Sequence, residues 1–282
     1  VYKLSLSSGC GCPNRDGTLG TRGCLFCDGA GAFAETGDIP AQLQRAKARL
    51  HGKEGEGRYI AYFQSFTNTY APAEYLRPLF EAAMEPEEIV ALSVATRPDC
   101  LPPEILDLLA ELNHRKPVWV ELGLQTIHPQ SAAYLRRGYE LPVFEEAVRA
   151  LRERGIEVIV HLILGIPGET REDMIASARY AGQWADGVKL HLLHVLDGTD
   201  LVAEYAAGRV RPLEREEYFG LLEDCLRVLP SSVVIHRLTG DGDKRRLLAP
   251  LWSADKKAVL NAMRRRFEED DLVQGSALGK EA

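Results

Sequence analysis

The sequence has few cysteines, no long apolar run and no secretory signal pattern at its start. Six cysteines among 282 residues fit a reducing compartment better than a disulfide framework. Apolar stretches such as 156–166 have the length of a strand and are too short to cross a bilayer. The first residues lack the charged, apolar and small-residue order of a signal peptide. We therefore expect a cytoplasmic protein without a membrane partner.

The charge of the chain is also uneven. A net charge of −7 disfavours a nucleic-acid footprint over the whole surface. Residues 244–266, however, contain eight Lys or Arg and a single acid, Asp255. This basic segment is interpreted either as a solvated helix face or as a surface for a polyanion such as tRNA.

Apolar strand-like segments alternate with helical segments along most of the chain. Strands are expected at 2–6, 58–64, 89–95, 118–124, 157–164, 188–193 and 233–235, and helices at 40–50, 72–84, 103–112, 142–154, 170–184 and 213–229. This alternation predicts an α/β fold in which helices cover a parallel sheet. Six or seven units suit a partial (β/α)6-type barrel better than a closed eightfold one.

Two regions are expected within this fold. Residues 1–229 would form the barrel, including an N-terminal cysteine loop. Residues 230–282 would form a short C-terminal extension packed on the barrel, with a basic helix and a flexible tail from about residue 273.

A loop over residues 7–33 gathers most of the cysteines. Cys12, Cys24 and Cys27 have the spacing C-x11-C-x2-C, and Cys10 precedes them in a glycine-rich context. Thiolates crowded in this way indicate a metal or an iron–sulfur cluster. Three thiolates would leave one iron of a four-iron cluster open to another ligand, as in a catalytic metal site. The alternative is a structural zinc site that also uses Cys10.

Further landmarks follow the loop words CPNRDGT and GCLFC. They are YFQSFTNTYAP (62–72), ATRPDCL (95–101), VELGLQTIHPQS (120–131), HLILGIPGET (161–170), KLHLLHVLDGTDL (189–201), IHRLTGD (235–241) and APLWSADK (249–256). In this order the sequence resembles the radical S-adenosylmethionine (SAM) superfamily, and within it a YhcC-like bacterial branch near the radical domain of the elongator tRNA-modifying subunit. The superfamily's common spacing is C-x3-C-x2-C, so the first gap here is longer.

The resemblance implies that Cys12, Cys24 and Cys27 ligate a [4Fe–4S] cluster that binds SAM, with Cys10 as a spectator. The cofactor-binding residues that it implies are Phe26, Gln64, Ser65, Thr67, Glu121, Gln125, Gly165, Ile166, Pro167 and His191. Phe26 and the 165–168 turn would lie near adenine, 64–67 near the methionine amino group, and Glu121 and Gln125 near the ribose. Alternatively, Glu121 is a salt-bridged interior carboxylate, and 165–168 is a plain strand-to-helix turn.

Polar residues at strand ends and in the basic segment are candidates for substrate binding: Arg97, Lys189, His236, Arg237, Trp252 and Lys256. Each also has a structural interpretation. Arg97 can be part of a turn, the histidine can be an ordinary hydrogen-bonding residue, and Trp252 can be buried in a lid.

The resemblance implies a radical SAM enzyme that reductively cleaves SAM to a 5′-deoxyadenosyl radical, which abstracts a hydrogen atom. A reducing partner such as flavodoxin or ferredoxin is implied as well. The substrate could be tRNA, bound through the basic segment, or a small metabolite or protein side chain. A non-catalytic module that binds zinc or a cluster is the alternative from another class.

Overall fold

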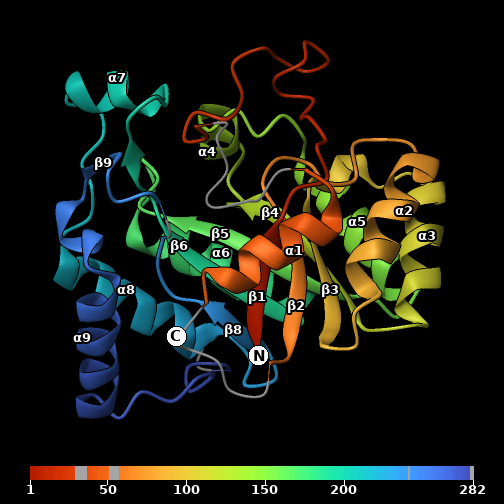
Figure 1. Cartoon of the computed structure of the whole chain (residues 1–282). Helices are drawn as coiled ribbons and strands as arrows, with labels where there is room; N and C mark the ends of the chain where they lie inside the picture. Colours follow the sequence, from red (N-terminus) through yellow and green to blue (C-terminus); the bar gives the residue numbers. More distant parts are fainter. Residues whose placement is uncertain (29–36, 51–56, 241, 280–282) are drawn as a thin grey trace. The chain divides into compact units, whose positions relative to one another are not determined.

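The computed structural model describes residues 1–28, 37–50, 57–240 and 242–279 (Figure 1). Within these residues the main sheet has the strand order β1 (Tyr2–Leu6), β2 (Tyr59–Phe63), β3 (Ile89–Thr96), β4 (Val118–Gln125), β5 (Glu157–Leu164), β6 (Gly187–Leu192), β8 (Val234–Arg237). β1–β2, β2–β3, β3–β4 and β6–β8 pair in parallel. This confirms the expected α/β class with a parallel sheet.

The chain divides into two compact units, and each consists of segments that are not consecutive in sequence. Unit 1 comprises Val1–Gly23, Gly29–Gly123 and Tyr139–Ile159, and unit 2 comprises Cys24–Asp28, Leu124–Gly138 and Val160–Ala282. The division passes through β4 and β5. It also separates Cys12, in unit 1, from Cys24 and Cys27, in unit 2.

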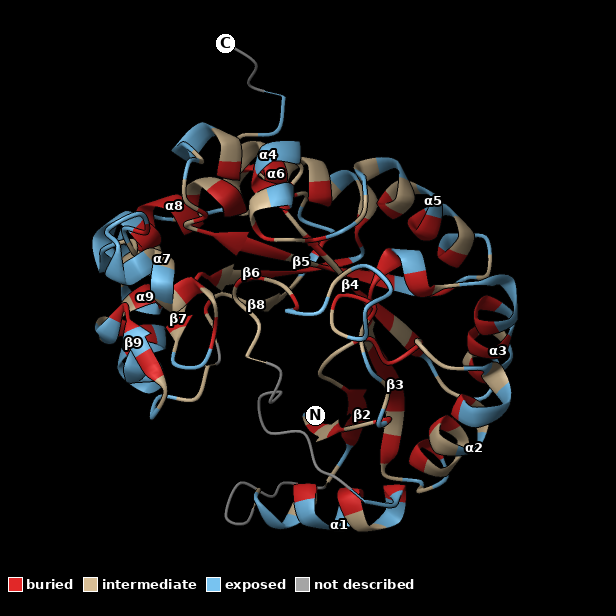
Figure 2. Cartoon of the chain, turned by 90° about the horizontal axis from the view of Figure 1, so that it is seen from above, coloured by how far each residue is buried: buried red, intermediate tan, exposed pale blue. Residues whose placement is uncertain are grey.

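Unit 1 packs helices on one side of its strands. These are α1 (Ile39–Ala48), α2 (Ala73–Met84), α3 (Pro103–Asn113) and α5 (Leu141–Arg152), with a 3-10 turn η1 at Pro98–Cys100. Figure 2 shows the buried sides of α1, α2 and α3 turned toward β2 and β3. All five residues of β2 are buried, so both faces of this strand are shielded from solvent. The Asp38 carboxylate caps α1 by accepting from the Ala41 N–H at 2.8 Å.

Unit 2 contains α4 (Pro129–Tyr134), α6 (Arg171–Trp184), α7 (Leu201–Ala206), α8 (Arg215–Val228) and α9 (Lys256–Glu269). α6 begins with a capping box, in which the Thr170 and Asp173 side chains each bind the other residue's backbone N–H. A small two-stranded sheet pairs β7 (Val195–Leu196) antiparallel with β9 (Leu247–Ala249), and the 3-10 turn η2 (Leu251–Ala254) follows β9.

Residues 274–277, where the sequence predicts a loose tail, hydrogen-bond to the end of α8. Gln274 Nε2 donates to the carbonyls of Pro230 and Val233 at 2.6 and 2.8 Å. The N–H groups of Gly275 and Ala277 donate to the last turn of α8 at 3.0 and 2.8 Å. The tail therefore satisfies carbonyl groups that a helix end leaves unpaired.

None of the helices in the described part of the chain combines the length and the hydropathy that a bilayer span requires.

Candidate functional site

The segment that carries Cys12 is tied to the end of β2 by hydrogen bonds. Asn68, which is 1% exposed, accepts at Oδ1 from the Ser8 hydroxyl at 2.7 Å. Its Nδ2 donates to the carbonyls of Ser65 and Ala95 at 2.9 and 3.0 Å. The Thr67 N–H donates to the Gly11 carbonyl at 3.2 Å. The turn at 64–67 thus lies directly beside the residues that precede Cys12.

Cys12 opens a tight turn. Its carbonyl accepts from the N–H groups of Arg15 and Asp16 at 2.8 and 3.2 Å. Gln64 is bound to β1 instead, since its Nε2 donates to the Ser5 hydroxyl at 3.0 Å and its N–H donates to the Leu6 carbonyl at 2.9 Å. Burial raises the pKa of the neighbouring Cys10 thiol, partly offset by a hydrogen bond from Ser8. Unit 1 therefore brings Ser65 and Thr67 beside the segment that precedes Cys12, and Gln64 beside β1.

Glu121 is buried in unit 1 and paired there. Its Oε1 accepts from Lys3 Nζ and from the Ser93 hydroxyl, both at 2.7 Å. The Lys3 ammonium lies 4.8 Å from the ring centre of Tyr62 and 5.7 Å from that of Trp119. This network is the paired interior carboxylate of the alternative interpretation. No short sequence pattern reveals it, because Lys3 and Glu121 are 118 positions apart.

Arg97 is likewise engaged by its surroundings. Its guanidinium makes a bidentate contact with Asp99, at 2.9 and 2.7 Å, and lies 5.4 Å from the ring centre of Tyr139. Nearby, burial raises the pKa of the Cys100 thiol to about 12, and the Asp99 charge adds to the effect. These contacts match the structural interpretation of Arg97 as part of the turn after β3.

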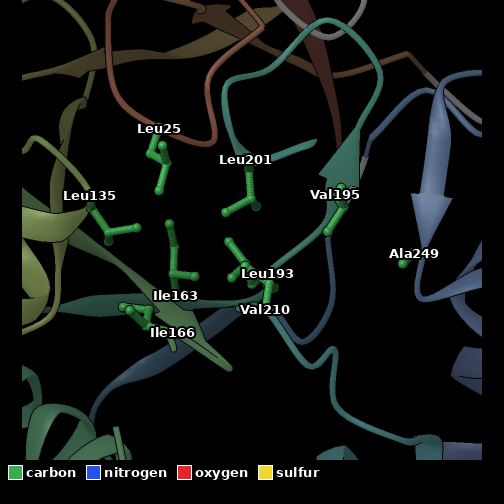
Figure 3. Close-up of a cluster of buried hydrophobic side chains, with 9 residues drawn as sticks. All are labelled: Leu25, Leu135, Ile163, Ile166, Leu193, Val195, Leu201, Val210 and Ala249. Atoms are coloured by element: carbon green, nitrogen blue, oxygen red, sulfur yellow. The ribbon is translucent and has the colours of Figure 1, made fainter. Parts of the chain in front are cut away.

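In unit 2 the Cys24–Cys27 turn is anchored by Leu25. The Cys27 N–H donates to the Cys24 carbonyl at 3.0 Å, which closes the turn. The Leu25 N–H donates to the Leu135 carbonyl at 3.1 Å, and its own carbonyl accepts from Leu201 at 3.0 Å. Its side chain is 4% exposed and points into an apolar cluster (Figure 3) formed with Leu135, Ile163, Ile166, Leu193, Val195, Leu201, Val210 and Ala249.

Phe26, inside the same turn, lines a cavity of about 200 Å³. The polar residues around this cavity are Gln125, His161, His191 and His194. The ring centres of His161 and His191 are 5.2 Å apart, and His194 Nε2 lies 3.1 Å from the Ser253 hydroxyl. The structure therefore brings three of the predicted cofactor residues, Phe26, Gln125 and His191, around one space in unit 2.

The turn after β5 borders the apolar cluster. Ile166 is a member of it, and the Gly165 N–H donates to the Met174 sulfur at 3.0 Å. Gly165 has φ +93°, a conformation that residues with a Cβ rarely adopt. Pro167 follows Ile166 and is half-buried. Residues 165–167 thus form the turn the alternative interpretation expects, and they hold Ile166 in the same cluster as Leu25.

The other predicted substrate residues of unit 2 are spread over several elements. Lys189 is 2% exposed, and His236 packs so closely on Gly187 that a Cβ there would lie 2.6 Å from its ring. Arg237 ends β8, and Lys256 begins α9. Trp252 Nε1 donates to the Leu213 carbonyl at 3.0 Å, and its ring packs on two aromatic residues of α8. The described residues that line the cavity include none of these five.

Acidic partners compensate much of the charge of the basic segment. Arg245 binds Asp243 at 2.7 Å and lowers the pKa of that carboxyl to about 2. Arg266 binds Glu223 at 2.6 Å and Glu216 at 3.0 Å. The count of charges along the sequence therefore overstates the positive field at this surface.

The cysteines have the chemistry that an iron–sulfur cluster requires, since all six are free thiols and Cys12, Cys24 and Cys27 are half-buried. Across the described ranges, no group of three or more His, Cys, Asp or Glu side chains is gathered for a metal ion. The donor set fits a cluster by its number and type of ligands.

A parallel α/β sheet, a cysteine loop and a cavity beside one of its turns define an α/β enzyme fold with a candidate cofactor site. Comparison with known families is consistent with this class. Residues 7–181 match the Radical SAM superfamily, and residues 185–269 match the Radical_SAM C-terminal domain. The chain belongs to the radical SAM superfamily and is an enzyme of that superfamily.

Relatives extend over nearly the whole chain. The Bacillus subtilis (strain 168) protein YtqA is 43% identical over 98% of this chain and 87% of its own length. YhcC of Escherichia coli (strain K12) is 38% identical over 99% of this chain and 91% of its own length. These matches confirm the YhcC-like branch.

Two further matches are more distant in sequence or cover only part of the chain. A tRNA uridine(34) acetyltransferase of Dehalococcoides mccartyi (strain CBDB1) is 30% identical over 54% of this chain and 33% of its own length. The structure of Methanocaldococcus infernus Elp3 superposes with a TM-score of 0.72 at 18% identity, over 97% of this chain and 64% of that one. The second match shows the shared fold, the partial barrel expected from the sequence.

Proposed function

We propose that Cys12, Cys24 and Cys27 hold a [4Fe–4S] cluster and that the cavity lined by Phe26 accepts the adenosyl part of SAM. The observation that carries the proposal lies within unit 2. There the Cys24–Cys27 turn is fixed by the burial of Leu25, and the next residue, Phe26, faces the cavity. The spacing of the three cysteines and membership of the superfamily support it.

The chain's own residues would bind and orient the cofactor. Phe26 offers an aromatic face for a purine, and Gln125 and His191 offer hydrogen-bonding groups around the same space. Ile163 and Leu193, which also line the cavity, would exclude water from a reactive radical.

Cys12, Cys24 and Cys27 would hold the cluster, which together with SAM would supply one-electron reductive cleavage of SAM and so the hydrogen-abstracting chemistry of the reaction. The electron would come from a protein such as flavodoxin or ferredoxin. A reducing cytoplasm, in which free thiols persist, is the proposed location.

We infer that tRNA is the leading substrate candidate. The partial match to a tRNA uridine(34) acetyltransferase supports this, as do the exposed Lys256 and Lys257 at the start of α9. A small metabolite or a protein side chain is the second candidate. The ion pairs that compensate the basic segment favour it, because they reduce the field available to a polyanion.

The experiment that tests the activity is anaerobic reconstitution with iron and sulfide, followed by dithionite and SAM. We expect 5′-deoxyadenosine from the wild type and none from Cys24→Ala. A zinc-loaded protein that never forms 5′-deoxyadenosine would leave the non-catalytic module as the function. For the substrate, tRNA binding that weakens with salt and with Lys256→Gln/Lys257→Gln supports the first candidate. Unchanged binding in that double variant would favour the second.

A further inference from the structure

Asp28, the residue directly after Cys27, is held by an arginine from the C-terminal part of the chain. Arg246 Nη1 donates to Asp28 Oδ2 at 2.7 Å, across 218 positions of sequence. The two side chains are 31% and 20% exposed, so the contact is mostly shielded from solvent. A shielded, charge-assisted hydrogen bond is stronger than an ion pair on an open surface.

Arg246 is also held by contacts with residues other than Asp28. Its guanidinium donates to the carbonyl of Asp197, and its own carbonyl accepts from the Asp197 N–H at 2.7 Å. Gly198 provides the space, since a Cβ there would lie 2.6 Å from Nη2 of Arg246. The flanking strands β7 and β9 pair antiparallel, with Leu196 opposite Leu247. The β7/β9 pair and the Asp197 contacts therefore orient the guanidinium toward Asp28.

The preceding residue provides a natural contrast. Arg245 has the same side chain but is 82% exposed and binds Asp243, two positions away. Of these two neighbouring arginines, Arg246 contacts the cysteine turn and Arg245 contacts its own loop. Arg245 is therefore a matched control for any effect of charge in this part of the sequence.

We propose that Arg246 is a positioning residue that acts through Asp28 on Cys27 and sets the charge beside the bound cluster. The inference rests on the proposed function, because it takes Cys27 as a cluster ligand. Residues 185–269 would then stabilise the Cys24–Cys27 turn in two ways. They supply much of the apolar socket of Leu25, including Leu201, and they supply the cation that holds Asp28.

The first test uses the full-length protein without iron and measures how fast iodoacetamide alkylates Cys27, resolved by peptide mass spectrometry. Loss of the contact should release the turn and speed alkylation by about fivefold in Arg246→Gln and in Asp28→Asn. Arg245→Gln should react at the wild-type rate, and Arg246→Lys should fall between. Equal rates in the wild type, Arg246→Gln and Arg245→Gln would overturn the positioning role.

The second test measures the midpoint potential of the reconstituted cluster by EPR-monitored titration. Arg246→Gln removes a positive charge and should lower the potential, and Asp28→Asn should raise it. The double variant should return close to the wild type, a pattern that general loosening of the turn does not produce. Shifts of both single variants in the same direction, or no shift in either, would overturn the electrostatic part.

The two failures are distinguishable. A wild-type chain that takes up no iron on reconstitution would refute the proposed function, whereas the alkylation rates would still decide whether Arg246 positions Cys27. A wild type that binds the cluster normally, with single variants that behave like Arg245→Gln, would refute this inference and leave the proposed function intact.

Discussion

The two parts of the cysteine loop are held in place by different physics. The Cys12 segment in unit 1 depends on polar contacts, with Asn68 bridging Ser8 to the end of β2. The Cys24–Cys27 turn in unit 2 depends on the burial of Leu25 in an apolar cluster. Hydrogen bonds fix direction at modest net stability, whereas burial of a leucine contributes more but tolerates small displacements. Substitutions in the two segments should therefore differ in size and in kind.

Truncating Leu25 should have the largest effect. Leu25→Ala would leave a cavity in the apolar cluster and cost about 3 kcal/mol of unfolding free energy. Urea denaturation followed by circular dichroism measures this cost, and iron bound after reconstitution should fall with it. Leu19→Ala is the matched control, because Leu19 lies in the same loop but is 52% exposed. Equal losses from the two substitutions would show that burial of Leu25 does not anchor the turn.

Removing the Asn68 amide should come next. Asn68→Ala would leave the Ser65 and Ala95 carbonyls and the Ser8 hydroxyl without this partner, at a cost of about 2 kcal/mol. We expect little loss of apolar burial, so the urea m-value should stay at the wild-type value. A loss below about 0.5 kcal/mol, the usual range of a neutral surface substitution, would contradict the polar anchoring of the Cys12 segment.

Unit 2 also contains a partly buried carboxyl group, Glu169, which should make its stability depend on pH. Burial raises the pKa of this carboxyl above its ordinary value of 4.5, although Thr126 donates to Oε1 at 2.5 Å. Among the described residues, Oε2 is buried without a hydrogen-bond partner. The folded state therefore binds the proton more tightly than the unfolded state, so stability should fall as pH rises above 4.5.

Glu169→Gln should remove this slope and stabilise the protein near neutral pH by about 1 kcal/mol, because no charge is then buried. Urea midpoints of the wild type and the variant, taken from pH 4.5 up to neutral pH, measure the difference. Parallel pH profiles for the two proteins would show that Glu169 ionises as freely in the folded state as in the unfolded state.

The smallest effect should come from the Tyr75 hydroxyl, which donates to the Ser8 carbonyl at 2.9 Å. Tyr75 is 48% exposed, so Tyr75→Phe removes one partly solvated hydrogen bond and should cost about 0.5 kcal/mol. Thermal unfolding of Tyr75→Phe and Asn68→Ala, measured side by side, ranks the two losses of stability. A larger loss of stability from Tyr75→Phe than from Asn68→Ala would mean that the tyrosine, not the asparagine, holds the Cys12 segment in place.

Helices and strands with a strong periodic pattern could be predicted from the sequence. The strands at 2–6 and 157–164 have the bounds that their apolar runs predict. The pair of strands β7 and β9 was not predicted, because strands of two and three residues show no periodicity. Helix α7 is similarly short, with six residues.

The parts of the candidate site that could be predicted from the sequence are residues whose type and spacing indicate a specific chemistry. Cysteines at fixed spacing and an aromatic residue inside the C-x2-C turn are such signals. The residues that support these groups could not be predicted from the sequence. Asn68, Asp28 and Arg246 act through partners that are 60 to 218 positions away. Asp28 directly after Cys27, and an arginine within the basic segment, were visible, but their pairing depends on the tertiary fold.

The most direct measurement is the metal content of the anaerobically reconstituted wild type and of single cysteine variants, with iron, sulfide and zinc assayed together. We predict about four irons per chain in the wild type and in Cys10→Ala, and loss of the cluster in Cys12→Ala, Cys24→Ala and Cys27→Ala. One zinc per chain that depends equally on all four N-terminal cysteines would contradict this prediction.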